Sequence, residues 1–296
     1  MRLKLVAPAL IAASALFLSG CVDNSTPTDE ETTATSTVTV DEAAVALLPA
    51  DVATAGVLEV GIDPTYPPNE YKDDEGNIVG WEVDLFDAIA AKLGLTTNYN
   101  ESTFDNIIPG IETGKYNVGV SSFFDKLERQ QVVDMVSYAT AGSQFAAATG
   151  SGVDPANLCG LTVAAQNGTA QYLEDLPKMT KACEDAGKPA IEVLGFDTQD
   201  QATTAVIVGK ADAFVADSPV TQYAVSVSDG QLELAGDIYD VYFYAFPATK
   251  DSGLAAALSA AVNSLIADGT YMAILSGAGL DASAITESSV NAETEK

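Results

Sequence analysis

The sequence predicts an α/β protein built as two lobes, on the evidence of two patterns. Short apolar segments alternate with amphipathic ones over residues 56–285, which is typical of strands joined by helices in open sheets. In addition, a Gly-Lys pair followed by a short apolar strand occurs at residues 114–120 and again at 209–215. A body of about 230 residues fits one large α/β domain or two of about a hundred each, and the repeat favours two.

The first half of this body contains two helix patterns. Apolar residues spaced three and four apart predict a helix at 82–93, which Gly94 ends. A second helix is expected at 104–113, after the cap candidates Ser102 and Thr103. The predicted strands, which are short and apolar, lie at 57–62, 96–99 and 118–121, and the turn-forming residues 72–77 predict a hairpin.

The second half repeats this alternation with shorter segments. Pro219 suits the first turn of a helix, because its missing N–H would have no partner there. The predicted strands are 161–165, 191–194 and 213–216, and the predicted helices are 169–176, 200–208 and 219–227. If both halves fold as βαβ lobes, the carboxyl ends of their strands face a common crevice, where open α/β sheets bind ligands.

The N-terminus has the pattern of a bacterial lipoprotein signal. A basic start precedes an apolar run over residues 5–17, and Leu-Ser-Gly-Cys then ends at Cys21. We therefore expect a signal peptide at 1–20 and a diacylated Cys21 that anchors the protein to the cell membrane. The segment 21–55 is expected to be a disordered, acidic tether with a short helix at 41–53.

The chain is strongly acidic, which excludes nucleic acid as a partner. Removal of residues 1–20 leaves 11 of the 13 basic residues against all 42 acidic ones, so the net charge becomes about −31. The chain contains no histidine, which argues against triad hydrolases and against most zinc sites. The lack of histidine does not exclude an enzyme that works with carboxylates, lysine or tyrosine, but we expect no enzyme activity, no cofactor and no metal.

Two cysteines remain once Cys21 is lipidated. Cys159 and Cys183 form an even pair in an oxidising compartment, and we expect a structural disulfide between them. A redox pair is disfavoured at this separation, and a metal site lacks other soft ligands.

After the signal peptide, the chain keeps a single arginine, Arg129. Its planar fork of donors can hold a carboxylate through two parallel hydrogen bonds, which lysine cannot do. It follows a polar turn with two hydroxyl groups, Ser121 and Ser122, directly after an apolar strand. These residues could form a seat for a small carboxylate; the alternative is a surface arginine paired with Glu128 or Asp125.

Several segments match the pattern of one known family in the same order. Residues 80–90, Gly-Trp-Glu-Val-Asp-Leu-Phe-Asp-Ala-Ile-Ala, are similar to a signature of glycine, an aromatic or aliphatic residue, and alternating acidic and aliphatic residues. Further matching segments are residues 60–68, 104–110, 129–131 and 268–271. The chain thus resembles, over about 58–277, the extracellular solute-binding proteins of amino-acid ABC transporters, family 3.

This resemblance implies the periplasmic-binding-protein-like fold, in which each lobe is a βαβ-type open sheet and two crossing strands join the lobes. The strands would cross near 144–149 and 241–247. The expected parts are a discontinuous lobe 1 at 56–143 and 248–285, lobe 2 at 150–241, and a disordered tail at 286–296.

The resemblance also implies a ligand site between the lobes. Arg129 would bind the α-carboxylate of an amino acid, and Asp217 would bind its α-ammonium group. Tyr66 and Phe104 would flank the ligand, while Asp63 would reach the far end of its side chain. The full set of expected ligand contacts is Asp63, Tyr66, Phe104, Ser121, Ser122, Arg129, Thr169 and Asp217.

Each placement has a structural alternative. The aromatic residues could serve only packing, Asp63 could cap the turn before Pro64, and Asp217 could cap the following helix. Two positions depart from the family pattern, because Phe124 and Ala170 replace hydroxyl residues that usually contact the carboxylate. These departures weaken the carboxylate seat or reshape it.

The sequence therefore predicts a monomeric, lipid-anchored receptor outside the cytoplasm that delivers a polar amino acid to an ABC transporter permease. Basic and amide amino acids are the favoured ligands, since Asp63 and the neighbouring Glu70 suit a polar or cationic side chain. Two alternatives stay open: a cyclohexadienyl dehydratase on the same fold, and the ligand-sensing partner of a signalling system.

Overall fold

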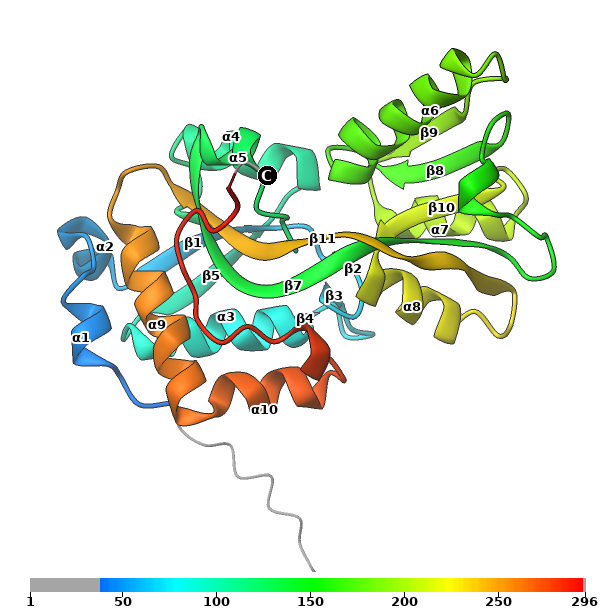
Figure 1. Cartoon of the computed structure of the whole chain (residues 1–296). Helices are drawn as coiled ribbons and strands as arrows, with labels where there is room; N and C mark the ends of the chain where they lie inside the picture. The colour runs from blue at the N-terminus through cyan, green and yellow to red at the C-terminus, as the bar shows by residue number, and fades with distance from the viewer. Residues whose placement is uncertain (1–37, 295–296) are drawn as a thin grey trace, which may run out of the picture. The chain divides into compact units, whose positions relative to one another are not determined.

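The structure is a computed structural model that describes residues 38–294 (Figure 1). The predicted signal peptide at 1–20 and the lipidation site Cys21 lie outside the described residues, as does the tether up to residue 37. The helix expected at 41–53 is present as two short pieces, α1 (Glu42–Val45) and α2 (Ala50–Ala55). Pro49, which has no N–H to donate, stands between them.

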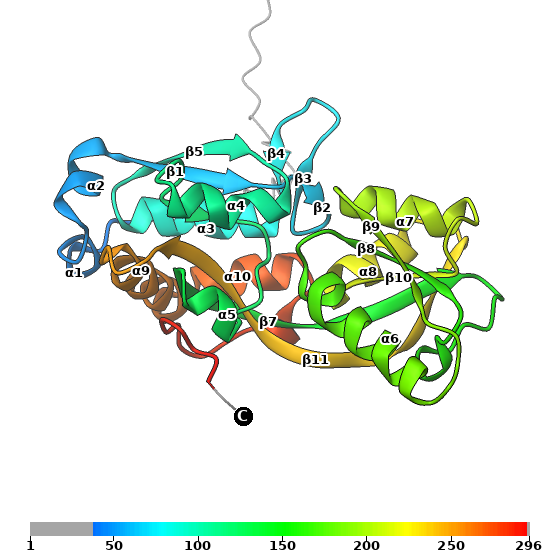
Figure 2. The ribbon, with the colours of Figure 1, turned by 90° about the horizontal axis from the view of Figure 1, so that it is seen from above.

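One continuous eight-stranded sheet runs through both lobes (Figure 1, Figure 2). Within each lobe the outer strands pair in parallel, and the two long central strands run antiparallel to their neighbours. In spatial order the strands are β5 (Thr96–Glu101), β1 (Val57–Ile62), β6 (Val118–Gly119), β11 (Leu232–Thr249), β7 (Val133–Ala148), β10 (Ala213–Asp217), β8 (Thr162–Gln166) and β9 (Glu192–Phe196). The α/β class and the two-lobed arrangement are confirmed.

Strands β7 and β11 join the lobes, because each is long enough to belong to both. At one end β11 pairs with β6, and at the other β7 pairs with β10. The register of β11 against β7 shifts at three points between Ala235 and Ala245. Gly142 lies at the second of these points, where a Cβ atom would stand 2.6 Å from the carbonyl oxygen of Tyr239. Pairing with β10 begins at Ser143, slightly before the crossing expected at 144–149.

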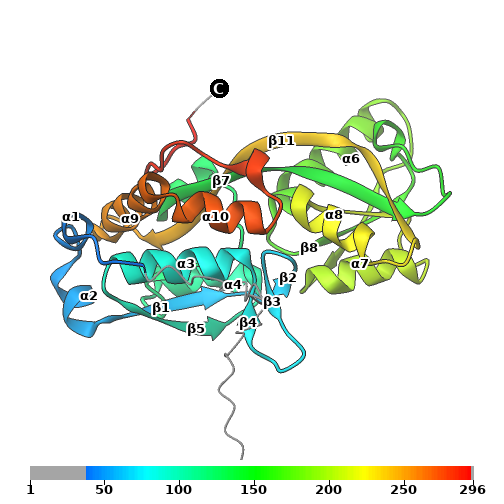
Figure 3. The same cartoon turned by 90° about the horizontal axis from the view of Figure 1, so that it is seen from below.

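Helices cover both faces of the sheet in each lobe. In lobe 1, α3, α9 and α10 pack on one face (Figure 3) and α4 on the other. In lobe 2, α7 and α8 pack on one face and α6 on the other. The helices are α3 (Trp81–Lys92), α4 (Phe104–Glu112), α5 (Leu127–Gln130), α6 (Leu176–Asp185), α7 (Gln199–Ile207), α8 (Ser218–Ser226), α9 (Leu254–Asp268) and α10 (Thr270–Gly277).

Strand β1 shows how the sequence produces these two faces. Leu58, Val60 and Ile62 alternate along the strand and are fully buried against α3 and α9. Gly61 lies between them on the α4 face, where a Cβ atom would stand 2.6 Å from the Tyr116 ring. The strand can therefore pack closely on both sides, as in other α/β sheets.

A second, three-stranded sheet lies in lobe 1 near the cleft. It consists of β2 (Thr65–Tyr66), β3 (Glu70–Lys72) and β4 (Ile78–Val79), and all pairs are antiparallel. The predicted hairpin turn at 72–77 joins β3 to β4. This sheet carries two buried residues of the site, Tyr66 and Glu70.

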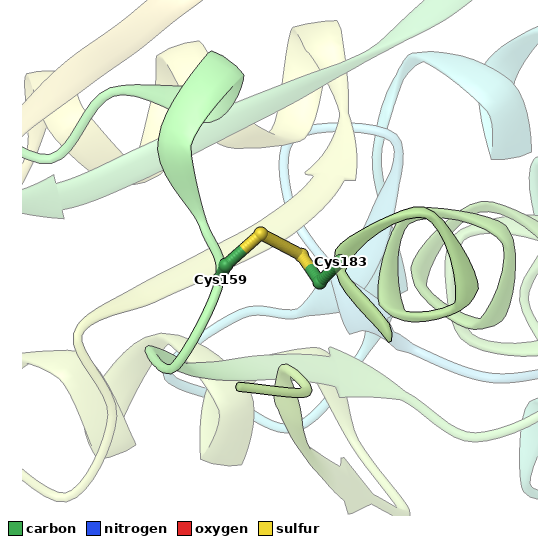
Figure 4. Close-up of a disulfide and its surroundings, with 2 residues drawn as sticks. All are labelled: Cys159 and Cys183. Carbon is green, nitrogen blue, oxygen red and sulfur yellow. A yellow bond between two sulfur atoms is a disulfide. The ribbon is translucent and has the colours of Figure 1, made fainter. Parts of the chain in front are cut away.

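The expected disulfide is present in lobe 2 (Figure 4). Cys159 lies in the loop before β8, and Cys183 lies on α6, with their Cα atoms 5.5 Å apart. The bond holds α6 against the edge of the sheet that β8 and β9 form.

The C-terminal segment corrects one prediction. Residues 286–296 were expected to be disordered, but residues 286–294 lie in order along lobe 1. The Ser137 N–H donates to the carbonyl oxygen of Ser289 at 3.0 Å, and Val290 forms a bridge with Val136. The segment lacks the apolar periodicity of a strand, so backbone pairing with β7 holds it, and composition does not reveal such pairing.

Candidate ligand-binding site

A small cavity lies between the lobes, at the carboxyl ends of their strands. All eight residues expected as ligand contacts line it. Phe124 and Ala170, the two departures from the family pattern, line it as well. Two further lining residues, Gln166 and Gln171, were not expected from the sequence. Gln166 ends strand β8. As a polar residue directly after a predicted apolar strand, it could have been identified from the sequence as a lining residue.

Arg129 comes from α5 in lobe 1. Its guanidinium donates to the carbonyl oxygens of Phe124 at 2.9 Å and of Gly168, in lobe 2, at 3.3 Å. The rings of Phe104 and Phe123, stacked 4.4 Å apart, flank it at 5.6 and 5.2 Å. Burial lowers its pKa to about 10, so it stays charged near neutral pH. Within residues 38–294 no carboxylate forms a salt bridge with it.

Asp217 ends strand β10 in lobe 2. Its carboxylate accepts hydrogen bonds from Gln171 Nε2 at 2.7 Å and from the Tyr244 hydroxyl at 2.8 Å. Its own N–H donates to the Tyr66 hydroxyl at 3.1 Å. Burial raises the pKa of Asp217 to about 7, and the hydrogen bonds offset only part of this effect. A nearby cation would therefore stabilise the ionised form of Asp217.

Asp63 follows strand β1 in lobe 1. Its carboxylate accepts from Thr65 Oγ1 at 2.8 Å, from the Phe104 N–H at 3.1 Å and from Gln166 Nε2 at 2.8 Å. Gln166 belongs to lobe 2, so this last bond links the lobes. Burial raises the pKa of Asp63 to about 6.

Two glutamates lie behind the serine turn. The carboxylate of Glu82 accepts from the Ser122 N–H at 3.1 Å and from its hydroxyl at 2.6 Å. Ser122 has a φ of 52°, a left-handed conformation that a non-glycine residue rarely adopts. Glu70 accepts from the Ser121 hydroxyl at 3.1 Å. Both glutamates are fully buried, and burial, followed by the charge of Glu82, raises the pKa of Glu70 well above its ordinary value.

The lobe 2 side of the cavity differs in detail from the prediction. The helix expected at 169–176 is a π-helical turn, η2 (Gln171–Asp175), that continues into α6. The Thr169 hydroxyl donates to the Gln166 carbonyl oxygen at 2.8 Å, so its proton is already used. At the rim, Lys126 of lobe 1 forms a salt bridge of 2.8 Å with Glu174 of lobe 2. Together with the contacts of Arg129 with Gly168 and of Asp63 with Gln166, this salt bridge joins the two lobes in this structure.

Two α/β lobes that share two strands and enclose a polar cavity define a two-lobed ligand-binding protein. The sequence matches the model of the bacterial extracellular solute-binding proteins, family 3, over residues 58–277. This match covers most of the chain, so the protein belongs to this family, and the family places it outside the cytoplasm. Within residues 38–294, no group of three or more metal-ligating side chains is arranged to hold a metal ion.

Similar proteins include several named for arginine. The arginine-binding protein ArgT of Corynebacterium glutamicum is 38% identical over 248 residues, which are 83% of this chain and 82% of the relative. The L-arginine-binding protein of Pseudomonas aeruginosa is 27% identical and covers 73% of this chain and 85% of its own length. Among solved structures, an ancestral arginine-binding protein bound to arginine has a TM-score of 0.69 at 30% identity, with 75% and 97% of the chains covered.

Proposed function

We propose that this protein is a receptor that binds a basic amino acid, arginine foremost, between its lobes. One observation carries the proposal: the cavity holds a half-buried guanidinium, Arg129, and two buried carboxyl groups, Asp63 and Asp217. Within the described residues, none of the three forms a salt bridge. A zwitterion with a cationic side chain offers three charges of the complementary signs. The relatives named for arginine support this choice.

In the proposed complex the two lobes share the ligand's main-chain groups. Arg129 from lobe 1 binds the α-carboxylate through its fork, beside Ser122 and Thr169. Asp217 from lobe 2 binds the α-ammonium group with help from the Ser121 carbonyl oxygen. Because each lobe holds one of the two charges, the ligand favours the closed arrangement over an open one.

The far end of the ligand lies beside Asp63 in this proposal. Tyr66 and Phe104 flank the aliphatic part of its side chain, and Asp63 pairs with the terminal cation. Glu70 lies behind the nearby Ser121 hydroxyl, where burial favours its neutral form, so Asp63 is the group that pairs with the cation. Such surroundings favour arginine, lysine or ornithine and disfavour glutamate.

The remaining parts of the proposal concern transport. We infer that the receptor passes its ligand to an ABC transporter permease and acts as a monomer, held at the membrane by diacylated Cys21. We take residues 56–143 and 248–285 as lobe 1 of the receptor and residues 150–241 as lobe 2. Family membership supports the transport role.

An enzymatic role is the second candidate. One solved structure with a TM-score of 0.65 and 26% identity is an ancestral amino acid-binding protein described as a precursor of cyclohexadienyl dehydratase. The named relatives are binding proteins, which favours the receptor. Incubation of the purified protein with prephenate or arogenate tests the alternative, since any turnover above background would support an enzyme.

The receptor is tested by calorimetric titration of residues 22–296 with arginine, lysine, ornithine, histidine, glutamine and glutamate. We expect the basic amino acids to bind most tightly. Asp63→Asn should weaken arginine binding by about 10- to 100-fold and glutamine binding by less than about threefold, because only the terminal cation loses its partner. Asp105→Asn, an exposed acid on α4, is the matched control. A preference for glutamate, or equal losses for both ligands, would contradict the assignment.

A further inference from the structure

The C-terminal strap, residues 286–294, lies beyond the region that matches the family model, which ends at 277. It runs along lobe 1 and ends beside α5 (Figure 1, Figure 2). We propose that this strap positions Arg129 for ligand binding. The inference rests on the proposed function, in which Arg129 holds the carboxylate of the ligand.

The first part of the strap is fixed to helix α9. The carbonyl oxygen of Ser288 accepts hydrogen bonds from the Ser259 hydroxyl at 3.1 Å and from Asn263 Nδ2 at 3.0 Å. The Ser288 N–H donates to Asn263 Oδ1 at 2.8 Å. Asn263 thus uses both ends of its amide on one residue of the strap, which sets the point where the strap leaves α9.

The middle of the strap pairs with the start of β7. The Asn291 N–H donates to the Met135 carbonyl oxygen at 2.7 Å, and the Met135 N–H donates to Asn291 Oδ1 at 2.9 Å. Ser289 makes a similar exchange with Ser137, through its carbonyl oxygen at 3.0 Å and its N–H to the Ser137 hydroxyl at 2.9 Å. The strap therefore has a defined register as it approaches α5.

The end of the strap is hydrogen-bonded to Gln130 of α5 and to Asp125, which lies just before α5. Gln130 Nε2 donates to the Glu293 carbonyl oxygen at 2.9 Å and to Asp125 Oδ1 at 2.8 Å. The Glu293 N–H donates to Asp125 Oδ2 at 3.1 Å. Asp125 is fully buried, and its own N–H donates to the Phe243 carbonyl oxygen on β11 at 2.8 Å. Asp125 thus joins the strap and α5 through its carboxylate and the central sheet through its backbone N–H.

Helix α5 needs such support more than other helices do. It has only four residues, none of them buried, and Lys126 at its N-cap makes no side-chain capping bond. A single helical turn is not stable alone. Arg129 is the third of these residues, next to Gln130, so movement of α5 moves the guanidinium. Small displacements of a charged fork cost much of its affinity for a carboxylate.

The test compares two truncations of the 22–296 protein. A stop after Asn291 removes the contacts with Asp125 and Gln130 but keeps the pairing with β7, and a stop after Thr294 is the matched control. We expect the first to weaken arginine binding by about three- to thirtyfold, with a melting temperature within about 2 °C of the control.

A second comparison, made in Arg129→Ala protein, distinguishes a general loss of stability from a loss of positioning of Arg129. In Arg129→Ala protein the same truncation should change the remaining affinity by less than about twofold, because the positioned group is gone. An equal loss in both backgrounds would overturn the inference, as would unchanged affinity in the truncated protein. If the full chain binds none of the amino acids, the proposed function fails instead. The strap is then judged by amide hydrogen exchange at 126–131, which must be faster in the truncated protein.

Discussion

Asp217 gives the sharpest test of the site, because its surroundings favour a neutral group until a ligand arrives. Asp217→Asn keeps the shape of the side chain and removes its charge. The amide oxygen can still accept from Gln171, and the amide group can donate to the Tyr244 hydroxyl oxygen in place of the present bond. We therefore expect the ligand-free variant to be more stable than the wild type at neutral pH and to bind amino acids poorly.

The magnitude follows from the pKa of Asp217, which burial raises from 3.8 to about 7. Between these values the folded protein holds a proton that the unfolded chain has released. The ligand-free protein therefore loses stability as the pH rises through this window, whereas the variant does not. At about 1.4 kcal/mol per pKa unit, the variant should gain about 2 kcal/mol at pH 5 and about 4 kcal/mol at pH 8.

The assay is urea unfolding of the ligand-free proteins at pH 5 and pH 8, with arginine titration of each folded form. Asp74→Asn, an exposed acid in the β3–β4 turn, serves as the control and should differ from wild type by less than about 0.5 kcal/mol. A variant that is less stable at pH 8, or a gain that does not grow between the two pH values, would refute the reasoning. Arginine affinity should fall by at least about 100-fold.

Two further predictions concern the carboxylate seat and the turn behind it. Arg129→Lys should weaken arginine binding by at least about 30-fold in calorimetry, because lysine lacks the planar fork, and near-native affinity would disprove the carboxylate assignment. Glu70→Gln should change binding by less than about threefold, since an amide resembles the neutral acid that burial favours there. Glu82→Gln should cost more than about tenfold, because an NH2 group replaces one of the two carboxylate oxygens that accept from the strained serine. Equal effects of the two changes would show that the glutamates share one role.

The sequence predicted those parts of the fold whose signals are local. Strand β1 lies at 57–62 as expected, because its alternating apolar residues are all buried on one face. The residues expected around the ligand line one cavity, since they follow strand ends or open helices that face the cleft. Their roles in ligand binding stay predictions.

Features that depend on distant partners were missed. Gln171 lies inside a predicted helix, and only the π-helical turn brings its amide to Asp217. The strap has a polar composition typical of a disordered tail, yet its backbone pairs with β7, more than 150 residues earlier in the chain. Propensity and periodicity describe neighbours in sequence, so they do not report such pairing.

The shared strands β7 and β11 also impose an order on folding. Lobe 2 is built from one uninterrupted stretch of chain, but lobe 1 needs the second half of β11, α9 and α10, which are synthesised after that stretch. As the chain emerges from a ribosome or a secretion channel, lobe 2 can close its sheet while the early strand β6 still waits for its neighbour β11. Strand β6 carries an unpaired edge during this interval, so the N-terminal third of the chain is the part most exposed to aggregation or to chaperone binding before the last helices arrive.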